Sequence, residues 1–168
     1  KKPIVSRSVS SNTPVVMPEA PTSPQYDYLM DESYEGWKAE KDKIYYLPEG
    51  KSLTTGVKFH DNIYYVAGEL TITNYWTEWG YSGKLVVLPS GKVNYPANTP
   101  IDNIEILNYG EFNVDGDIFN VNVNASFMTL GDLCYNEMML GGTIYVDDAI
   151  LAQKMDVREY STCHVGCG

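Results

Sequence analysis

From residue 43 onward, short runs of alternating apolar and polar residues recur along the chain, each interrupted by a turn at or near a glycine. Alternation with a period of two is typical of strands that bury one face. The clearest runs are residues 44–53, 63–72, 85–95 and 104–114, with weaker copies around Gly131 and Ala149. The turn markers are Gly50, Gly68, Gly91, Gly110, Gly131, Ala149 and Gly168, at intervals of 18, 23, 19, 21, 18 and 19 residues. Intervals this regular indicate a fold built from similar stacked units.

The repeat predicts an all-β fold. One unit of two or three short strands leaves the backbone groups along both of its edges unpaired. Stacking the next unit about 4.8 Å away pairs those groups and continues the apolar interior. We therefore expect a single-stranded parallel β-solenoid, right-handed, with about six coils of roughly 20 residues each. A β-sandwich is the alternative, although its turns recur about every 8–12 residues and show no self-similarity in sequence.

The chain changes character twice before the repeats begin. Residues 1–25 hold five of the nine prolines and many serines, a composition typical of an extended tether. Residues 26–42 are expected to cap the first coil, with a short helix over residues 29–37. The repeats then fill residues 43–168. Because Gly168 falls on the repeat spacing, we expect further coils of a longer chain to follow.

Composition and charge narrow the class of protein. The 168 residues are 43% hydrophobic and 20% charged, which is ordinary for a folded globular domain. Twelve Lys and Arg against 22 Asp and Glu give a net charge of −10. So acidic a chain repels a phosphate backbone, which argues against nucleic acid as a partner. No apolar run approaches the roughly 18 residues of a membrane span, so we expect no integral membrane segment.

Four of the repeat motifs resemble a known group of proteins. The motifs are YLPEGKSL (46–53), IYYVAGELTI (63–72), LVVLPSGK (85–92) and ILNYGEFNV (106–114). They are similar to the repetitive β-solenoid regions of secreted or lipid-anchored surface proteins of Bacteroidetes, in particular the region before the C-terminal module of LruC-domain proteins. The resemblance implies an exported protein of the cell surface, with an outer-membrane lipoprotein as one form, and a role in adhesion.

An aromatic cluster occupies the longest interval between turn markers, which spans 23 residues. Its members are Tyr75, Trp76, Trp79 and Tyr81. An insertion into a solenoid projects from one face, and flat aromatic rings stack on sugars or on partner chains. The cluster is therefore our candidate ligand-binding platform. A loop folded down to cover the flank of the stack is the alternative.

Adjacent carboxylates at Asp147 and Asp148 resemble the paired acids of β-helical polysaccharide hydrolases, which need an acid and a base on either side of a sugar bond. Such enzymes add a histidine and a cationic clamp, and His164 and Arg158 are the nearest candidates. A polar turn between two strands needs the same residues for backbone reasons. We favour the turn and expect no catalytic residue.

A second group of oxygen-bearing side chains is Asn113, Asp115 and Asp117, at alternate positions around Gly116. On an extended strand these three would point the same way and could bind a hard cation such as calcium. A turn between two coils would also use Asn, Asp and Gly. Calcium is therefore a minor hypothesis here.

Cysteines are few, and only the pair Cys163 and Cys167, with His164 between them, suggests zinc. A fourth ligand is missing from the sequence nearby, and the third cysteine, Cys134, lies in another repeat. Cysteines that face the core of a coil are the simpler interpretation. No glycine-rich phosphate loop or G-x-S-x-G motif occurs, so we expect neither metal nor cofactor.

These observations together predict a non-enzymatic structural or adhesion scaffold of the cell surface. A carbohydrate-binding module is the first alternative, and a polysaccharide-active β-helical enzyme is the second. The expected partners are a glycan or another surface protein. An aromatic platform facing solvent would favour the binding module, whereas acidic groups converging across neighbouring coils would favour the enzyme.

Overall fold

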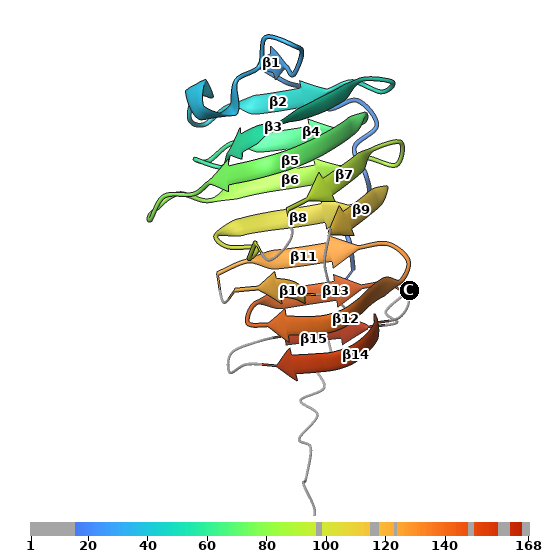
Figure 1. Cartoon of the computed structure of the whole chain (residues 1–168). Helices are drawn as coiled ribbons and strands as arrows, with labels where there is room; N and C mark the ends of the chain where they lie inside the picture. The colour runs from blue at the N-terminus through green and yellow to red at the C-terminus, as the bar shows by residue number, and fades with distance from the viewer. Residues whose placement is uncertain are drawn as a thin grey trace, which may run out of the picture.

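Strands dominate the computed structural model, which describes residues 16–96, 99–114, 118–122, 124–147, 150–157 and 162–165. In these residues the chain forms fifteen β-strands and one short 3-10 helix, η1 (Gly36–Lys38), and no α-helix. The strands wind into a parallel β-solenoid of about six turns (Figure 1). The stacked fold predicted from the repeat is thus confirmed.

Two walls of parallel strands enclose the interior. The first wall is an eight-stranded sheet. In spatial order its strands are β1 (Tyr28–Leu29), β2 (Ile44–Leu47), β4 (Ile63–Val66), β6 (Gly83–Val87), β8 (Ile104–Asn108), β11 (Ser126–Thr129), β13 (Thr143–Val146) and β15 (Thr162–Val165). Two smaller sheets follow one another along the stack and form the second wall (Figure 1). Their strands are β3 (Ser52–Lys58), β5 (Glu69–Trp76), β7 (Lys92–Tyr95) and β9 (Glu111–Val114), then β10 (Ile118–Val121), β12 (Leu133–Leu140) and β14 (Ile150–Val157).

Register explains why the sequence repeats. Tyr45 pairs with Tyr64, and Tyr64 pairs in turn with Leu85, so equivalent residues of successive coils lie directly above one another. Every strand pair in the described residues is parallel. A β-sandwich is built from antiparallel strands, so that alternative does not apply.

The core lies between the walls as columns of inward-facing side chains. One column of the first wall is buried over six successive coils; its members there are Tyr45, Tyr64, Leu85, Ile106, Phe127 and Ile144. A neighbouring column contains two polar residues, Asn108 and Thr129. The amide Nδ2 of Asn108 donates to Oγ1 of Thr129 at 2.9 Å, which satisfies both groups inside the core.

Glycine marks the corners because successive coils approach closely there. A Cβ atom added at Gly91 would lie 2.0 Å from the carbonyl oxygen of Val66 in the preceding coil. At Gly110 it would lie 2.3 Å from the carbonyl oxygen of Gly91. These contacts leave no room for a side chain, which accounts for the turn markers at Gly91 and Gly110, whereas Gly50 and Gly131 have open space and are required by their positive φ values of 76° and 72°.

The first coil is capped by a strand and a single 3-10 turn, so the short helix expected over residues 29–37 does not form. β1 instead pairs with β2, matching Tyr28 to Tyr45. Backbone pairing with the sheet outweighs a weak helical propensity that Gly36 lowers further. Met30 beneath this segment is 1% exposed, so the cap closes that end of the core.

Residues 16–25, within the predicted tether, lie against the outer face of the first wall (blue in Figure 1). Met17 is buried in a cluster of outward-facing apolar residues that includes Val86 and Leu107. The hydroxyl of Tyr109 donates to the carbonyl oxygen of Pro18 at 2.5 Å. This part of the N-terminal region is therefore held on the stack.

At the other end of the stack, inward-facing side chains are less covered. Val165 continues the column that contains Val146 but is 44% exposed, whereas Val146 is fully buried. Met155 stands in the same relation to buried Met138 in the second wall. Whether further coils follow stays a prediction.

Candidate functional site

The aromatic cluster covers the end of β5, which holds Tyr75 and Trp76, and the connection to β6, residues 77–82, which holds Trp79 and Tyr81. This connection projects from one side of the stack (Figure 1). The backbone N–H of Tyr81 donates to the carbonyl oxygen of Glu78 at 3.0 Å, which closes a tight turn. Gly80 adopts a φ of 86° within that turn, a conformation that side chains disfavour. Trp79 is consequently at the tip and 95% exposed.

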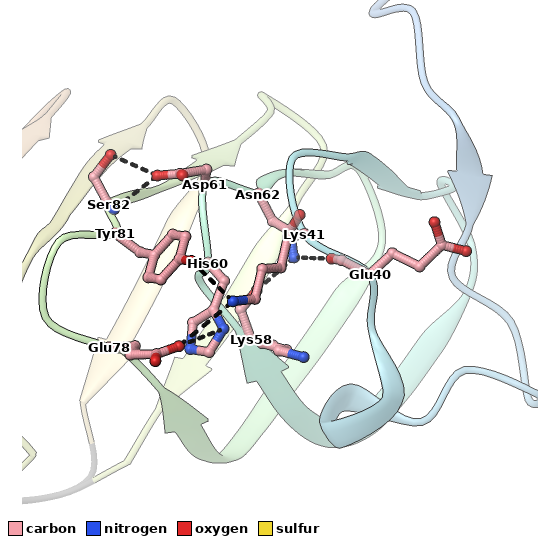
Figure 2. A network of polar contacts seen from close by, with 9 residues as sticks. All are labelled: Glu40, Lys41, Lys58, His60, Asp61, Asn62, Glu78, Tyr81 and Ser82. Atoms are coloured by element: carbon pink, nitrogen blue, oxygen red, sulfur yellow. Dashed lines mark hydrogen bonds and ion pairs between the residues drawn. The ribbon is translucent and has the colours of Figure 1, made fainter.

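Lys41 of the N-terminal cap and His60 of the preceding coil hold this loop in place. The ring of Tyr81 stacks on the imidazole of His60, with centroids 5.3 Å apart. The ammonium of Lys41 lies 4.1 Å from the centroid of the Tyr81 ring and donates to its hydroxyl at 3.0 Å. Figure 2 shows Glu78 and Tyr81 of the loop pointing toward Lys41 and His60. The loop is thus docked on the preceding corner of the solenoid.

Glu78 links the two basic residues of this network. Its Oε2 atom lies 3.6 Å from Nζ of Lys41 and 3.6 Å from Nδ1 of His60. Glu78 and Lys41 are both about half exposed, so solvent screens their attraction and the ion pair itself stabilises the loop little. The contacts of Glu78 matter more for the orientation of the loop than for its stability.

His60 is the buried member of the network. Its side chain is only 11% exposed, and neither ring nitrogen has a hydrogen-bond partner in the described part of the chain. Burial lowers the pKa of His60, and the positive charges of Lys58 and Lys41 act in the same direction against the opposing effect of Glu78 and Asp61. The imidazole is therefore neutral at neutral pH.

The other two aromatic residues of the cluster serve the fold. Tyr75 lies beside the core and makes ring contacts with Phe59 and Tyr95. Trp76 is half-buried, and its ring lies over Gly56, where a Cβ atom would come within 2.5 Å of it. Gly56 therefore provides the flat surface on which Trp76 packs.

The four predicted residues consequently do not form one platform. Tyr75 and Trp76 cover the second wall, Tyr81 anchors the loop on His60, and Trp79 alone is free to contact a partner. The platform interpretation therefore fits Trp79, and the interpretation as a cover of the flank fits Tyr75 and Trp76. Sequence reasoning missed Lys41, which no local pattern connects with this loop.

The acid pair is only partly described. Asp147 follows β13, and its backbone N–H donates to the carbonyl oxygen of Thr129 in the preceding coil at 3.1 Å, which continues the pairing between coils by one residue. Asp148 and Arg158 lie outside the described residues, and so does the side chain of His164. The catalytic hypothesis for these residues thus gains no geometric support and stays a hypothesis.

Of the calcium candidates, only Asn113 is described. Its amide Nδ2 donates to Oδ1 of Asn94 at 3.3 Å and to Oε1 of Glu111 at 2.9 Å. Asn113 is therefore part of a polar ladder on the outer face of the second wall. Asp115 and Asp117 lie outside the described residues.

The zinc motif is likewise incomplete in the described residues. Cys163 lies in β15 beside Ile144 and is exposed, as is Cys134 in β12, while Cys167 is outside the described residues. No three His, Cys, Asp or Glu side chains within the described ranges are placed to hold a metal ion. Among the helices that the structure describes, none is long and apolar enough to cross a membrane.

Comparisons with known proteins add no relative. No protein-family model, no curated protein and no solved structure matches this chain. The class established by the structure is a parallel β-solenoid with one projecting aromatic loop. The resemblance to Bacteroidetes surface proteins stays a prediction.

Proposed function

We propose that this chain is a non-enzymatic adhesion scaffold of the cell surface that contacts its partner through the loop bearing Trp79. The main support is the exposure of Trp79, which is 95% accessible at the tip of a loop whose base is fixed. A large indole ring that stays in water gains none of the free energy that burial of its apolar surface would provide. Contact with a partner would recover that burial.

The stack suits a scaffold. Each inner strand of the first wall is hydrogen-bonded on both sides, and the core columns interlock along the axis. Solenoids of this kind are stabilised by contacts between neighbouring units. A loop that is fixed on such a stack has little conformational freedom to lose when its ring binds a partner. A small entropy loss on binding favours affinity.

A glycan is the partner we favour, which makes a carbohydrate-binding module the second candidate. Indole rings stack on the apolar faces of sugars, and Glu78 and Lys41, which contact each other where the loop docks, can exchange hydrogen bonds with hydroxyl groups. The net charge of −10 disfavours polyanions. The cell-surface location rests on the resemblance of the repeats and can be tested by adding protease to intact cells.

A glycan array separates contact through Trp79 from non-specific stickiness. We would compare the parent protein with Trp79→Ala and with Trp37→Ala, because Trp37 is also exposed, at 62%, but lies on η1 in the cap. The proposal expects the array signal to fall at least tenfold in Trp79→Ala and to persist in Trp37→Ala. Equal signals from the parent and Trp79→Ala would refute contact through this loop.

A further inference from the structure

A groove of about 520 Å³ runs across four successive coils beside the first wall. It lies at the corner where the chain enters β4, β6, β8 and β11. The loop that bears Trp79 reaches this corner where the chain enters β6. Ser82, three residues after Trp79, belongs both to that loop and to the groove. The groove and the exposed indole are thus joined by the chain itself.

Polar side chains line the groove at a constant interval. Asp61, Ser82, Asn103 and Asn124 follow one another every 21 residues, and each occupies the equivalent corner position of its coil. Asp61 and Asn103 adopt positive φ values of 57° and 51°, which Asp and Asn tolerate better than most residues. The corner therefore presents one hydrogen-bonding side chain per coil.

Contacts between coils fix the geometry of this ladder. The backbone N–H of Ser82 donates to Oδ1 of Asp61 at 2.9 Å, and the Ser82 hydroxyl lies 3.4 Å from the same oxygen (Figure 2). The backbone N–H of Gly83 donates to the carbonyl oxygen of Asn103 at 3.2 Å. The Asp61–Ser82 pair and the backbone of the corner at Asn103 are thus arranged before any ligand arrives.

The charges along the groove nearly cancel. Lys84 and Glu105 face each other across adjacent coils, with Nζ and Oε1 3.4 Å apart. Asp61 is the remaining acid of the lining. A lining of carboxylate, hydroxyl and amide groups with no excess of positive charge suits neutral hydroxyl groups better than phosphate or carboxylate.

The spacing of the ladder points to a linear polymer. Coils repeat about every 4.8 Å, and an extended β-1,4-linked chain of pyranose units advances by nearly the same distance per sugar. We infer that the groove binds a neutral, linear β-linked glycan along the solenoid axis, with about one sugar per coil. This inference deepens the proposed glycan contact, since the loop that bears Trp79 joins the groove at Ser82, the second position of the ladder, and Trp79 would stack on the same chain there.

An extended peptide fits this groove less well. Peptides commonly bind sheets by adding a strand to a free edge. β4, β6, β8 and β11 are all paired on both sides, so their backbone groups are already used. The lining offers side chains only, at a spacing that suits repeating hydroxyl groups.

Isothermal titration with oligosaccharides of two to six units tests the inference, using β-1,4-linked glucose, xylose, mannose and N-acetylglucosamine series. Affinity for at least one series should rise with length up to about four units, the number of coils spanned, and then level off. Asn103→Gly, which suits the positive φ, and Asn124→Ala should each weaken binding about three- to tenfold, the effect of one lost hydrogen bond. Asn74→Ala, at an exposed amide of the second wall, is the matched control.

The other outcomes of the titration separate the groove inference from the proposed function. If groove variants bind like the parent while Trp79→Ala loses binding, the groove inference is overturned and the proposed function stands. Binding without length dependence, or no binding of any series at millimolar concentration, also overturns it. Binding of polygalacturonate that weakens with salt, or of an extended peptide, would assign the groove to a different ligand class and contradict the inference.

Discussion

The ring of Tyr81 lies on the imidazole of His60, with centroids 5.3 Å apart and 20° between their planes. One residue belongs to the projecting loop and the other to the corner of the preceding coil. Because His60 is buried and lacks a hydrogen-bond partner in the described residues, the position of Trp79 depends on a side chain that can change its charge.

Docking of the loop should weaken in mild acid. The pKa of His60 in the folded protein is below its unfolded value of about 6.5, so the unfolded state binds the proton more readily. The stabilisation is present above pH 6.5 and is lost as the pH falls through the folded pKa. Thermal unfolding between pH 7.5 and 5.5 should show a falling midpoint, and the fall should be smaller in His60→Phe, which keeps the stacked ring. An equal fall in both proteins would argue against this role of His60.

Trp76, at the end of β5, and Trp79, at the tip of the loop, should differ sharply in their effect on stability. Trp76→Ala removes a half-buried ring that packs over Gly56 and should cost about 1–3 kcal/mol of unfolding free energy, less than a fully buried ring would. Trp79→Ala should change it by no more than about 0.5 kcal/mol, as for other exposed positions. Urea unfolding of both variants measures the difference. Similar losses in the two would contradict the placement of the rings.

Close approach of the coils predicts that the corner glycines are not replaceable. Gly91→Ala would force a Cβ atom against the carbonyl oxygen of Val66 and should destabilise the protein by about 1–3 kcal/mol, as overpacking does. Glu49→Ala, at an exposed turn position, is the control and should stay within about 0.5 kcal/mol of the parent. An unchanged unfolding midpoint for Gly91→Ala would mean that the coils are spaced differently.

We expect no glycan cleavage by this protein. Incubation with pectins, glycans and mucins should release neither reducing sugar nor unsaturated product. Asp147 bonds the preceding coil through its backbone N–H, a contact that asparagine keeps, so Asp147→Asn should leave binding and stability close to those of the parent. Turnover that Asp147→Asn or Asp148→Asn abolished would instead establish the enzymatic alternative.

Much of the fold could be predicted from the sequence because the solenoid is governed by local, repeated rules. Alternation fixed which side of each strand faces inward, as in Tyr64 and Val66. Glycine at 68 and 91 marked corners where backbones approach. The register between coils then follows, because a slip by one residue would turn the apolar face outward.

Contacts outside the repeat could not be predicted in this way. The corner of one coil lies beside the loop of the next, which brings together Lys41, His60 and Tyr81. No spacing in the sequence predicts that contact. Met17 packs on the outer face of the first wall, although its proline-rich segment predicted an extended tether. Sequence reasoning also missed the 21-residue ladder from Asp61 to Asn124, because Asp, Ser and Asn are common in ordinary turns as well.

Adhesion under flow tests the central claim most directly. Beads coated with the parent protein, Trp79→Ala or Trp37→Ala would be settled on mucin and on cell layers and then exposed to rising shear. Parent and Trp37→Ala beads should remain attached at shear that removes nearly all Trp79→Ala beads. If Trp79→Ala beads hold as firmly as the parent, or if parent beads detach like uncoated ones, the claim that this solenoid is an adhesion scaffold acting through Trp79 is contradicted.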